Sequence, residues 1–518
     1  MNCPICDEGL FSYLFVVRGL PIAHCRGCGL TTLGILPKAA DFSEFYRGVA
    51  LAADPAPPSD SETERDASSR YLRALAGRGI KSGHILVIGV PERRASSESF
   101  LREAKMLGFQ VDFVEALESE TIAGDAHYDA AVILHRLQTQ ESPGALLESV
   151  YSAIKPDAPL LVTVPDVQSW PARFFGRQWT EWRPENRFHF DRRTIQLLFL
   201  RHGFGGILVR SDRRLYNLDH IYQRAYNHPR TALTRAISVL HKLVPEAISA
   251  RARVRLATSG MVVTAVRSER RPIPKCSIVV PAFNESKSFA LLMDALLEKQ
   301  LPGMDREIII VESNSSDGTR ELAQRYTEHP EVTLVLEDRP RGKGHAVREG
   351  FRRATGDVLL IQDADLEYDL NDYDALLAPI LGHRELFVIG TRHGGNWKMR
   401  KFAGQQGLST ALNFGHLFFT AVINLLYRQK MKDPFSMFKV FHRDCLYGLE
   451  FECNRFDFDH ELVIKLVRKG YTPLEIPVNY WSRSFRQGKK VRVFRDPFGW
   501  LWVDVKLRFE RLFRENLG

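Results

Sequence analysis

Runs of apolar residues alternate with helix-like segments along two long stretches of the chain. In the first stretch, the apolar runs predict buried strands at 84–89, 111–115, 129–134 and 159–164, and residues 97–108 have the spacing of a helix. Strands that alternate with helices build a parallel sheet with helices on its faces. The pattern therefore predicts a doubly wound α/β domain.

The same alternation restarts after a charged segment, RSERRPIPK at 267–275, that two prolines interrupt. Further strands are expected within 276–285, 306–314, 332–338 and 356–365, with helices between them. A second parallel α/β sheet is therefore predicted in the C-terminal half.

The composition is that of a soluble globular protein, with 44% hydrophobic and 26% charged residues. No apolar run reaches the ~20 residues that a membrane span needs, because Asn413, His416 and Asn424 interrupt the best candidate, Leu412 to Tyr427. The start, MNCPIC, lacks the basic and then apolar pattern of a secretory signal. We therefore expect a cytoplasmic protein.

The net charge of +9 is concentrated at the C-terminal end. Residues 480–518 contain ten Lys or Arg against four Asp or Glu. Such an end suits nucleic acid, an anionic membrane surface or a phosphorylated ligand. A solvated basic face explains the same composition equally well.

Four of the seven cysteines form two Cys-x-x-Cys pairs, and eighteen residues separate the pairs. This spacing predicts one tetrahedral zinc site built from Cys3, Cys6, Cys25 and Cys28. A reducing compartment disfavours disulfides. Four thiolates leave no position open for a catalytic water, so the Zn²⁺ is expected to be structural.

A polar, proline-rich run at 54–66, DPAPPSDSETERD, cannot bury a core and predicts a linker. The expected segments are a zinc ribbon at 1–35, a linker at 36–75, the two sheet domains at 76–268 and 269–495, and a basic amphipathic helix at 496–518.

Chemistry-bearing residues of the second sheet domain follow its predicted strands, where open α/β sheets bind ligands. Paired carboxylates one residue apart suit Mg²⁺ or Mn²⁺, and a lysine in a glycine-bearing loop suits a diphosphate. Taken singly, such motifs are mostly plain polar turns. In chain order, the candidates are Pro281, Ala282, Asn284 and Glu285, then Glu312 and Asp317, then Lys343 and Gly344, then Asp363, Asp365 and Glu367.

This order resembles the nucleotide-binding half of family 2 glycosyltransferases, which have the GT-A fold. Glu312 and Ser313 stand where members usually show two aspartates, but glutamate can still accept a hydrogen bond from a uracil or guanine edge. The resemblance implies base and ribose contacts from Pro281, Glu285, Glu312 and Asp317, and metal and diphosphate binding by Asp363 and Asp365.

Four later motifs narrow the resemblance. They are GTRH (390–393), DPFSMFKVF (433–441), FDFDHELVIKL (456–466) and EIPVNYWSRSFRQGKKV (475–491). Over about residues 275–500 the chain resembles the polyprenyl-phosphate glycosyltransferases, the dolichyl-phosphate mannosyl- and glucosyltransferase group. The Thr-Glu-Asp and Gln-x-x-Arg-Trp elements of processive polysaccharide synthases do not occur.

The resemblance implies transfer of glucose or mannose, with inversion, from a UDP- or GDP-sugar to a polyprenyl phosphate at the cytoplasmic membrane face. A lipid phosphate is already an anionic nucleophile, so its site needs cations rather than a general base. Asp459 and Glu461 would support the sugar or the basic loop. The expected acceptor-binding cations are Arg392, Arg483, Lys489 and Lys490.

Two aromatic-rich segments, 412–427 and 497–513, suit helices that lie in the headgroup region. Packing on the domain core or on a partner subunit fits the same pattern equally well. The resemblance implies peripheral attachment at the inner face of the membrane and no nucleic-acid partner, and it leaves a homo-oligomer open. An alternative acceptor is a hydroxyl of a glycan or glycolipid in surface polysaccharide synthesis.

The zinc ribbon and the first sheet resemble class I S-adenosylmethionine-dependent methyltransferases, from HILVIGV at 84 to FHFDRRTIQLLFLRHGF ending at 204. The hydrophobic framework fits, but Val87 replaces the acid before the first turn. Of the cofactor contacts, only Gly89 and the ribose-binding Glu115 remain. We expect a non-catalytic domain, such as a scaffold for partner enzymes; the alternative is a bifunctional enzyme that binds S-adenosylmethionine and transfers methyl groups.

Overall fold

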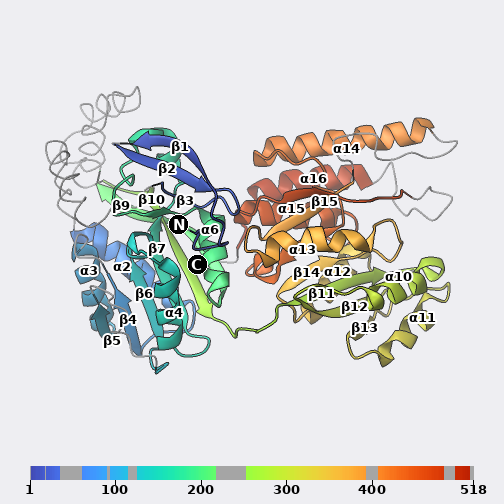
Figure 1. Cartoon of the computed structure of the whole chain (residues 1–518), viewed down its shortest axis with the longest axis horizontal. Coiled ribbons are helices and arrows are strands. Elements are labelled where there is room, and N and C mark those ends of the chain that lie inside the picture. The colour runs from blue at the N-terminus through green and yellow to red at the C-terminus, as the bar shows by residue number, and fades with distance from the viewer. Residues whose placement is uncertain are drawn as a thin grey trace. The chain divides into compact units, whose positions relative to one another are not determined.

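The chain divides between Glu269 and Arg270 into two compact units, each built on its own large sheet (Figure 1). The computed structural model describes residues 2–17, 19–34, 61–89, 94–114, 125–217, 252–392, 406–482 and 496–513.

The N-terminal unit contains a six-stranded sheet of order β5-β4-β6-β7-β10-β9. Its first four strands are parallel, as the sequence predicts, while β10 is antiparallel to both of its neighbours. The strands are β4 (His84–Ile88), β5 (Gln110–Val114), β6 (Ala130–Leu134), β7 (Pro159–Pro165), β9 (Phe204–Asn217) and β10 (Arg253–Arg267). The accompanying helices are α2 (Ser61–Ala76), α3 (Arg94–Met106), α4 (Pro143–Ala153), α5 (Trp170–Phe175) and α6 (Arg192–Arg201).

Helix α2 corrects the predicted linker at 36–75, because residues 61–75 are helical and packed. Ala67, Tyr71, Leu72 and Leu75 are buried against β4 and α3. The polar residues at the start of this segment concealed an apolar face whose members recur three to five residues apart. Residues 36–60 lie outside the described residues.

The cysteine-bearing segment forms a second, four-stranded sheet of order β1-β2-β3-β8. Trp179 and Trp182 pack against its apolar side chains, and the Arg201 guanidinium donates a hydrogen bond to the Ile5 carbonyl over 2.6 Å. The cysteine module is thus docked on its own unit. Its strands are β1 (Phe11–Val17), β2 (Leu20–Cys25), β3 (Thr31–Leu33) and β8 (Phe188–His189).

The C-terminal unit is built on a seven-stranded sheet of order β13-β12-β11-β14-β16-β15-β17. Strands β13, β12, β11 and β14 are parallel, as predicted; β16 is antiparallel to β14 and β15, which the sequence does not predict. The strands are β11 (Lys275–Ala282), β12 (Asp305–Glu312), β13 (Val332–Leu336), β14 (Val358–Ile361), β15 (Phe387–Thr391), β16 (Lys439–His442) and β17 (Leu474–Pro477). This mixed α/β sheet confirms the expected fold class.

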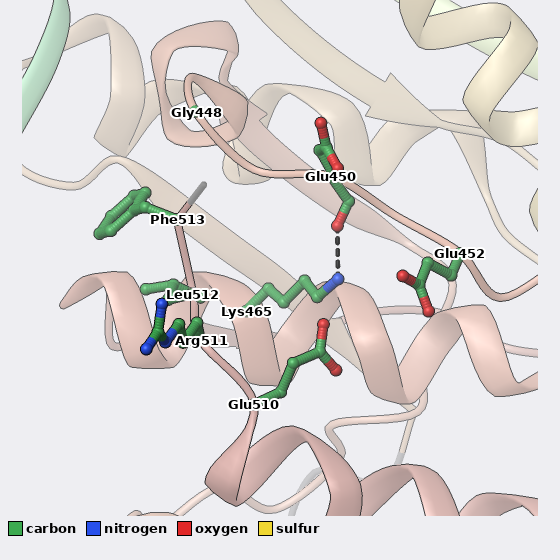
Figure 2. A pocket seen from close by; sticks show the side chains of 8 residues that line it. All are labelled: Gly448, Glu450, Glu452, Lys465, Glu510, Arg511, Leu512 and Phe513. Atoms are coloured by element: carbon green, nitrogen blue, oxygen red, sulfur yellow. Dashed lines mark hydrogen bonds between the residues drawn. The ribbon is translucent and has the colours of Figure 1, made fainter. Parts of the chain in front are cut away.

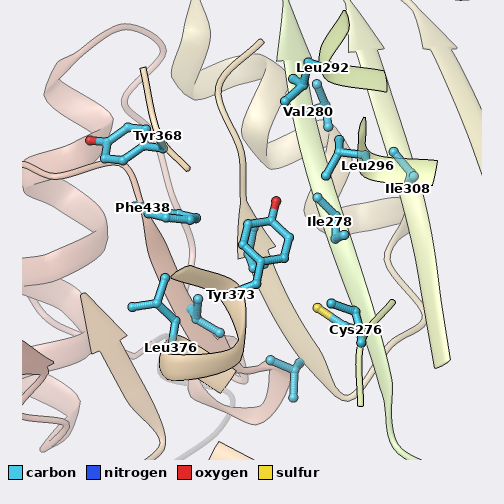
Figure 3. Packing of buried hydrophobic residues seen from close by; sticks show 14 of the residues in the cluster. Cys276, Ile278, Val280, Leu292, Leu296, Ile308, Tyr368, Tyr373, Leu376 and Phe438 are labelled. Carbon is cyan, nitrogen blue, oxygen red and sulfur yellow. The ribbon is translucent and has the colours of Figure 1, made fainter. Parts of the chain in front are cut away.

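Alternation along β11 explains how the second core forms. Cys276, Ile278 and Val280 lie on one face and pack against α10, α13 and Phe438 (Figure 3). On the other face, a Cβ added at Gly350 of α12 would lie 2.3 Å from Val279, so the glycine permits a close approach. The helices are α10 (Ser286–Glu298), α11 (Thr319–Arg325), α12 (Lys343–Arg353), α13 (Tyr373–Leu381), α14 (Gln406–Tyr427), α15 (Asp457–Lys469) and α16 (Asp496–Phe509).

Candidate functional site

The predicted site residues of the second unit gather at the carboxyl edge of its parallel strands. The loops after β11, β12 and β14 leave the sheet there, because these strands run side by side in the same direction. Strand β16 runs the opposite way, so its first residue, Lys439, lies at the same edge. The topology thus brings together segments that are distant in the sequence.

The loop after β14 carries the paired carboxylates. Asp363 and Asp365 are half-buried and flank the buried Ala364, whose carbonyl accepts a hydrogen bond from the Ser288 hydroxyl over 2.7 Å. The backbone N–H of Glu367 donates to the Asp365 carboxylate over 3.2 Å. Helix α10 and a local turn therefore hold the two carboxylates at the edge, accessible to a ligand.

Lys343, the first residue of α12, reaches this loop. Its Nζ lies 2.5 Å from Oδ1 of Asp363. Burial favours the neutral amine, but Asp363, Asp459 and Asp365 outweigh it and raise the pKa of Lys343. A permanent cation thus lies beside the paired carboxylates.

Two glycines bring the start of α12 against the loop before α15. Gly342 has a φ of +104°, and a Cβ there would lie 2.4 Å from the Asn454 carbonyl oxygen. A Cβ at Gly344 would lie 2.5 Å from Cβ of Phe458. Gly344 therefore allows close packing that positions Lys343, while the diphosphate binding expected of it stays a prediction.

The loops after β11 and β12 are joined by hydrogen bonds. The Asn284 N–H donates to the Ser315 hydroxyl, and the Asn284 side chain accepts from the Ser316 N–H, both over 2.9 Å. The backbone N–H of Ser313 donates to the carbonyl of the buried Ala282 over 3.0 Å. These contacts shape a rim beside Pro281, which is half-buried.

Glu312 is completely buried, and its carboxylate accepts from the Ser315 N–H over 2.6 Å and from Arg320 over 2.5 Å. Burial opposes ionisation, but these donors hold the pKa of Glu312 below its usual value. The sequence predicts that Glu312 contacts the nucleotide base. In the structure its carboxylate is hydrogen-bonded to Ser315 and Arg320 and orders the loop after β12.

Asp317 joins two helix starts. Its carboxylate accepts from the Thr319 hydroxyl over 2.6 Å and from the Ser286 N–H over 3.0 Å, and although burial works against ionisation, these bonds lower its pKa to about 2. The Glu285 N–H in turn donates to the Thr319 hydroxyl over 2.9 Å. Asp317 is exposed, so one side of this junction faces solvent.

Arg392 follows the carboxyl end of β15, where it forms a bidentate ion pair with Asp433. Its Nε and one terminal nitrogen contact the two oxygens of Asp433 at 2.9 and 2.7 Å. The Arg392 side chain is only 8% exposed and Asp433 is fully buried. The sequence predicts that Arg392 binds the acceptor phosphate. In the structure the Asp433 carboxylate already neutralises its charge, so Arg392 stabilises the carboxyl edge of the sheet.

Lys439 was missed by sequence reasoning. It is fully buried, its ammonium donates to the Ser436 carbonyl, and it lies 3.6 Å from Oδ1 of Asp459. This Asp459 oxygen is buried and accepts no hydrogen bond from the described residues. The only sequence signal was a lysine inside the apolar run of DPFSMFKVF.

Glu461 points to a structural role. It accepts from the backbone N–H groups of Glu452 and Cys453 and from Lys465, the last over 2.7 Å. It therefore orders the loop before α15 rather than facing the edge. Glu367, by contrast, accepts from the Tyr480 hydroxyl over 2.8 Å and links the loop after β14 to the segment after β17. The remaining predicted residues, Arg483, Lys489, Lys490 and Glu115, lie outside the described residues.

Helices α14, α15 and α16 lie together, away from the strands β11 to β13 (Figure 1). His460 of α15 stacks on Trp500, and its Nδ1–H donates to the Asp504 carboxylate of α16 over 2.8 Å. Large apolar side chains on the two outer helices remain exposed. They are Phe414, Leu417, Phe418 and Leu425 on α14, and Leu501, Trp502, Val505 and Phe509 on α16. None of the described helices is both long enough and apolar enough to span a membrane.

The N-terminal cysteines form the cluster that their spacing predicts. Cys3 and Cys28, and likewise Cys6 and Cys25, have sulfur atoms 3.5 Å apart. Tetrahedral zinc with Zn–S bonds of about 2.3 Å needs sulfur separations of about 3.8 Å. The four sulfurs lie within 4.8 Å of one another, so the residues fit a structural Zn²⁺.

At the carboxyl end of β4, Gly89 packs closely against protein side chains. A Cβ added at Gly89 would lie 2.5 Å from the Ser97 hydroxyl and 3.0 Å from the Phe113 ring. The long paired strands β9 and β10 also reach α2 and the end of β6. Arg214 of β9 contacts Glu64 of α2 at 2.6 Å and His135, which follows β6, at 3.4 Å. Protein side chains thus occupy space beside the end of β6.

A separate cavity of about 300 Å³ lies between α15 and residues 510–513, which follow α16 (Figure 2). Lys465 donates to the Glu450 carbonyl at its wall. None of the predicted site residues that the structure describes lines it. The lining residues are Gly448, Glu450, Glu452, Lys465, Glu510, Arg511, Leu512 and Phe513.

Comparison with known proteins supports both resemblances. The family model "Glycosyl transferase family 2" matches residues 277–448, and a model described as "Methyltransferase domain" matches residues 62–208.

Among curated proteins, a dolichol-phosphate mannosyltransferase of Pyrococcus furiosus is 27% identical over 220 residues, which cover 42% of this chain and 59% of that protein. A dolichyl-phosphate beta-glucosyltransferase of Trichomonas vaginalis is 29% identical over 217 residues, which cover 39% of this chain and 63% of that protein. The chain thus spans less than two thirds of the length of either relative.

Among solved structures, glucosyl-3-phosphoglycerate synthase of Mycobacterium tuberculosis, in complex with Mn²⁺ and UDP-glucose, is 20% identical with a TM-score of 0.31. That match covers 41% of this chain and 73% of the synthase. On the two family models, the chain carries a family 2 glycosyltransferase domain at residues 277–448 and a methyltransferase-type domain at residues 62–208.

Proposed function

We propose that the C-terminal unit transfers a hexose from a UDP- or GDP-sugar to a polyprenyl phosphate. The observation that carries the proposal is the group formed by Asp363, Asp365 and Lys343 at the carboxyl edge of a family 2 glycosyltransferase sheet. The Pyrococcus and Trichomonas relatives, named for transfer to dolichyl phosphate, support the choice of acceptor.

The donor diphosphate would bind over the loop after β14, which carries Asp363 and Asp365. Asp363 and Asp365 are oxygen donors of the kind that Mg²⁺ and Mn²⁺ prefer, and they are exposed enough to hold one. When bound, such a cation supplies neutralising charge for the leaving diphosphate. Lys343, whose ammonium already lies within 2.5 Å of Asp363, would contact the same phosphates.

The acceptor phosphate would meet the edge from the side of β15 and β17. It is anionic without assistance, so no side chain has to remove its proton. We propose that Arg483, Lys489 and Lys490, which follow β17 in the sequence, hold it. Arg392 would keep Asp433 neutralised and the edge in shape. A phosphate oxygen that attacks opposite the leaving diphosphate gives inversion.

The lipid would lie along the apolar faces of α14 and α16. Trp502 is 69% exposed and Phe418 is 49% exposed, whereas side chains of this size are normally buried. Aromatic residues among basic ones suit the headgroup region of a bilayer. We propose that the enzyme attaches peripherally, through these helices, to the cytoplasmic face of the membrane.

The decisive experiment incubates the full chain with undecaprenyl phosphate, Mn²⁺ and radiolabelled UDP-glucose or GDP-mannose. We expect label in the organic phase with one donor, none with undecaprenol, which lacks the phosphate, and none for Asp365→Ala with an unchanged melting temperature. Absence of label with both donors would count against the proposal. Transfer to a glycan hydroxyl instead would identify the alternative acceptor.

For the N-terminal unit we propose a non-catalytic role. The buried Val87 supports this, because it stands where the resemblance to methyltransferases implies an acid before the first turn. Calorimetry of the full chain with S-adenosylmethionine tests it. Heat of binding in the micromolar range would overturn the proposal and support a bifunctional enzyme.

A further inference from the structure

The amino edge of the first sheet carries a cluster of metal-ligand side chains that the proposed transfer does not use. His84 begins β4, Asp112 lies on the neighbouring β5, and His127 precedes β6. These three segments are adjacent in the sheet, in the order β5-β4-β6. The cluster therefore joins three parts of the sheet at the end opposite to its carboxyl edge.

The donor atoms of the three side chains converge. One nitrogen or oxygen from each lies within 4.8 Å of the other two. Nε2 of His84 is 3.0 Å from Oδ2 of Asp112, yet it is buried and has no hydrogen-bond partner in the described part of the chain. The imidazole nitrogen and the carboxylate oxygen are both metal-ligand atoms, and their separation allows one ion to contact both.

Tyr128 holds the cluster in place. Its hydroxyl donates to Oδ2 of Asp112 over 2.8 Å, which fixes the carboxylate. Its ring lies 4.7 Å from the ring of His84 and 3.9 Å from that of His127. The backbone N–H of His84 donates to Asp129 over 2.8 Å, which anchors the start of β4. Outer contacts of this kind orient ligands in metal sites.

We propose that His84, Asp112 and His127 bind a divalent transition-metal ion at the amino edge of the N-terminal sheet. Two imidazoles and one carboxylate select Zn²⁺, Ni²⁺ or Co²⁺ over Mg²⁺ and Ca²⁺, which prefer oxygen ligands. Three protein ligands leave positions for water, so the ion would be exchangeable, unlike one enclosed by four cysteines. Bound there, it would cross-link β4, β5 and the segment before β6.

The test uses tag-free full chain whose cysteine cluster is loaded with zinc, titrated with NiCl₂ in a calorimeter and in a thermal melt. We expect one Ni²⁺ per chain, a raised melting temperature, and no nickel–thiolate absorption band, which shows that the cysteines are not involved. His127→Ala should weaken binding by about tenfold or more, since it removes one of three ligands.

His329→Ala is the matched control, because His329 is exposed on the other unit and stacks on Tyr326; it should leave nickel binding unchanged. Asp112→Asn provides a second variant, and circular dichroism without metal shows that each variant is folded. No nickel binding by the wild-type chain would overturn the proposal. Equal affinity in His127→Ala and the wild type would do so as well.

Discussion

Lys343 and Asp363 form the closest contact between opposite charges at the proposed donor site, at 2.5 Å. If Lys343 also contacts the donor diphosphate, Lys343→Ala should raise KM for the nucleotide sugar and lower kcat/KM by about 10- to 100-fold, the effect of one charge-assisted hydrogen bond. Initial rates at varied donor concentration measure this. Lys287→Ala, on the exposed side of α10, is the control and should behave as wild type.

Arg392 and Asp433 make a different prediction, because their pair is buried. Asp433→Asn should leave the guanidinium uncompensated and lower the free energy of unfolding by about 3–5 kcal/mol. Urea titration of the variant measures the loss. The double variant Arg392→Met/Asp433→Leu should lose much less than the sum of the single changes. Additive losses would show that the two side chains do not support each other.

Glu307 predicts how stability depends on pH. Burial opposes its ionisation, but Lys275, Ser277 and Thr355 bind the carboxylate and lower its pKa to about 2. Its folded pKa is below the unfolded value of ~4.3, so its contribution is complete above that value and is lost as the pH falls toward 2. We expect urea midpoints between pH 5 and pH 3 to fall less in Glu307→Gln than in wild type.

Single residues were predictable where local sequence determines their position. Asp363 and Asp365 follow an apolar strand, and any residue there lies at the carboxyl edge. Arg392 was assigned to the acceptor phosphate as a cation near the site. Its partner, Asp433, lies 41 positions later, so the sequence did not reveal that the two side chains pair. Lys439 was missed because its strand is antiparallel, which apolar patterning does not reveal.

At the scale of elements, α14 and α16 present an unusual amount of apolar surface. Phe418→Ser combined with Trp502→Ser should reduce binding to vesicles that contain anionic lipid, because both side chains are exposed and removing them costs little folding stability. Co-flotation with vesicles measures this. Leu291→Ser is the matched control, since Leu291 is 63% exposed on α10. Equal flotation of all variants would refute a membrane role for these helices.

The cysteine cluster controls another element, the four-stranded sheet. Removal of zinc by a chelator should loosen β1–β3 and expose Trp179 and Trp182, which pack against it. We expect a red shift of tryptophan fluorescence that added Zn²⁺ reverses. Cys28→Ser should show the shifted spectrum from the start. An unchanged spectrum on chelation would mean that the sheet does not depend on the ion.

Element type and order were largely predictable, because parallel strands buried on both faces are continuous apolar runs. The exceptions have physical causes. Helix α2 begins with charged residues and resembled a linker, although Tyr71 and Leu75 bury its inner face. Strands β9 and β10 are long, and their pairing joins residues that are 36 or more positions apart in the sequence, such as Asn217 and Arg253.

For the whole molecule, two complete cores in two units account for the two family matches along one chain. The division was readable from the sequence, since a charged, proline-containing segment separates two runs of strand–helix alternation. The fold class of each unit followed from the same pattern. The assembly of the site did not, because it requires knowing which strands are neighbours in the sheet.

The placement of β16 between β14 and β15 also affects how the chain folds while it is synthesised on the ribosome. Strand β14 is entirely buried in the finished sheet, but the strand that covers one of its edges is encoded roughly 80 residues later. At about 5–20 residues per second, that edge waits about 4–16 s for its partner. An apolar edge left open for this time invites pairing with other nascent chains. Productive folding of the glycosyltransferase domain should therefore depend on chaperones that shield the emerging chain until β16 has been made.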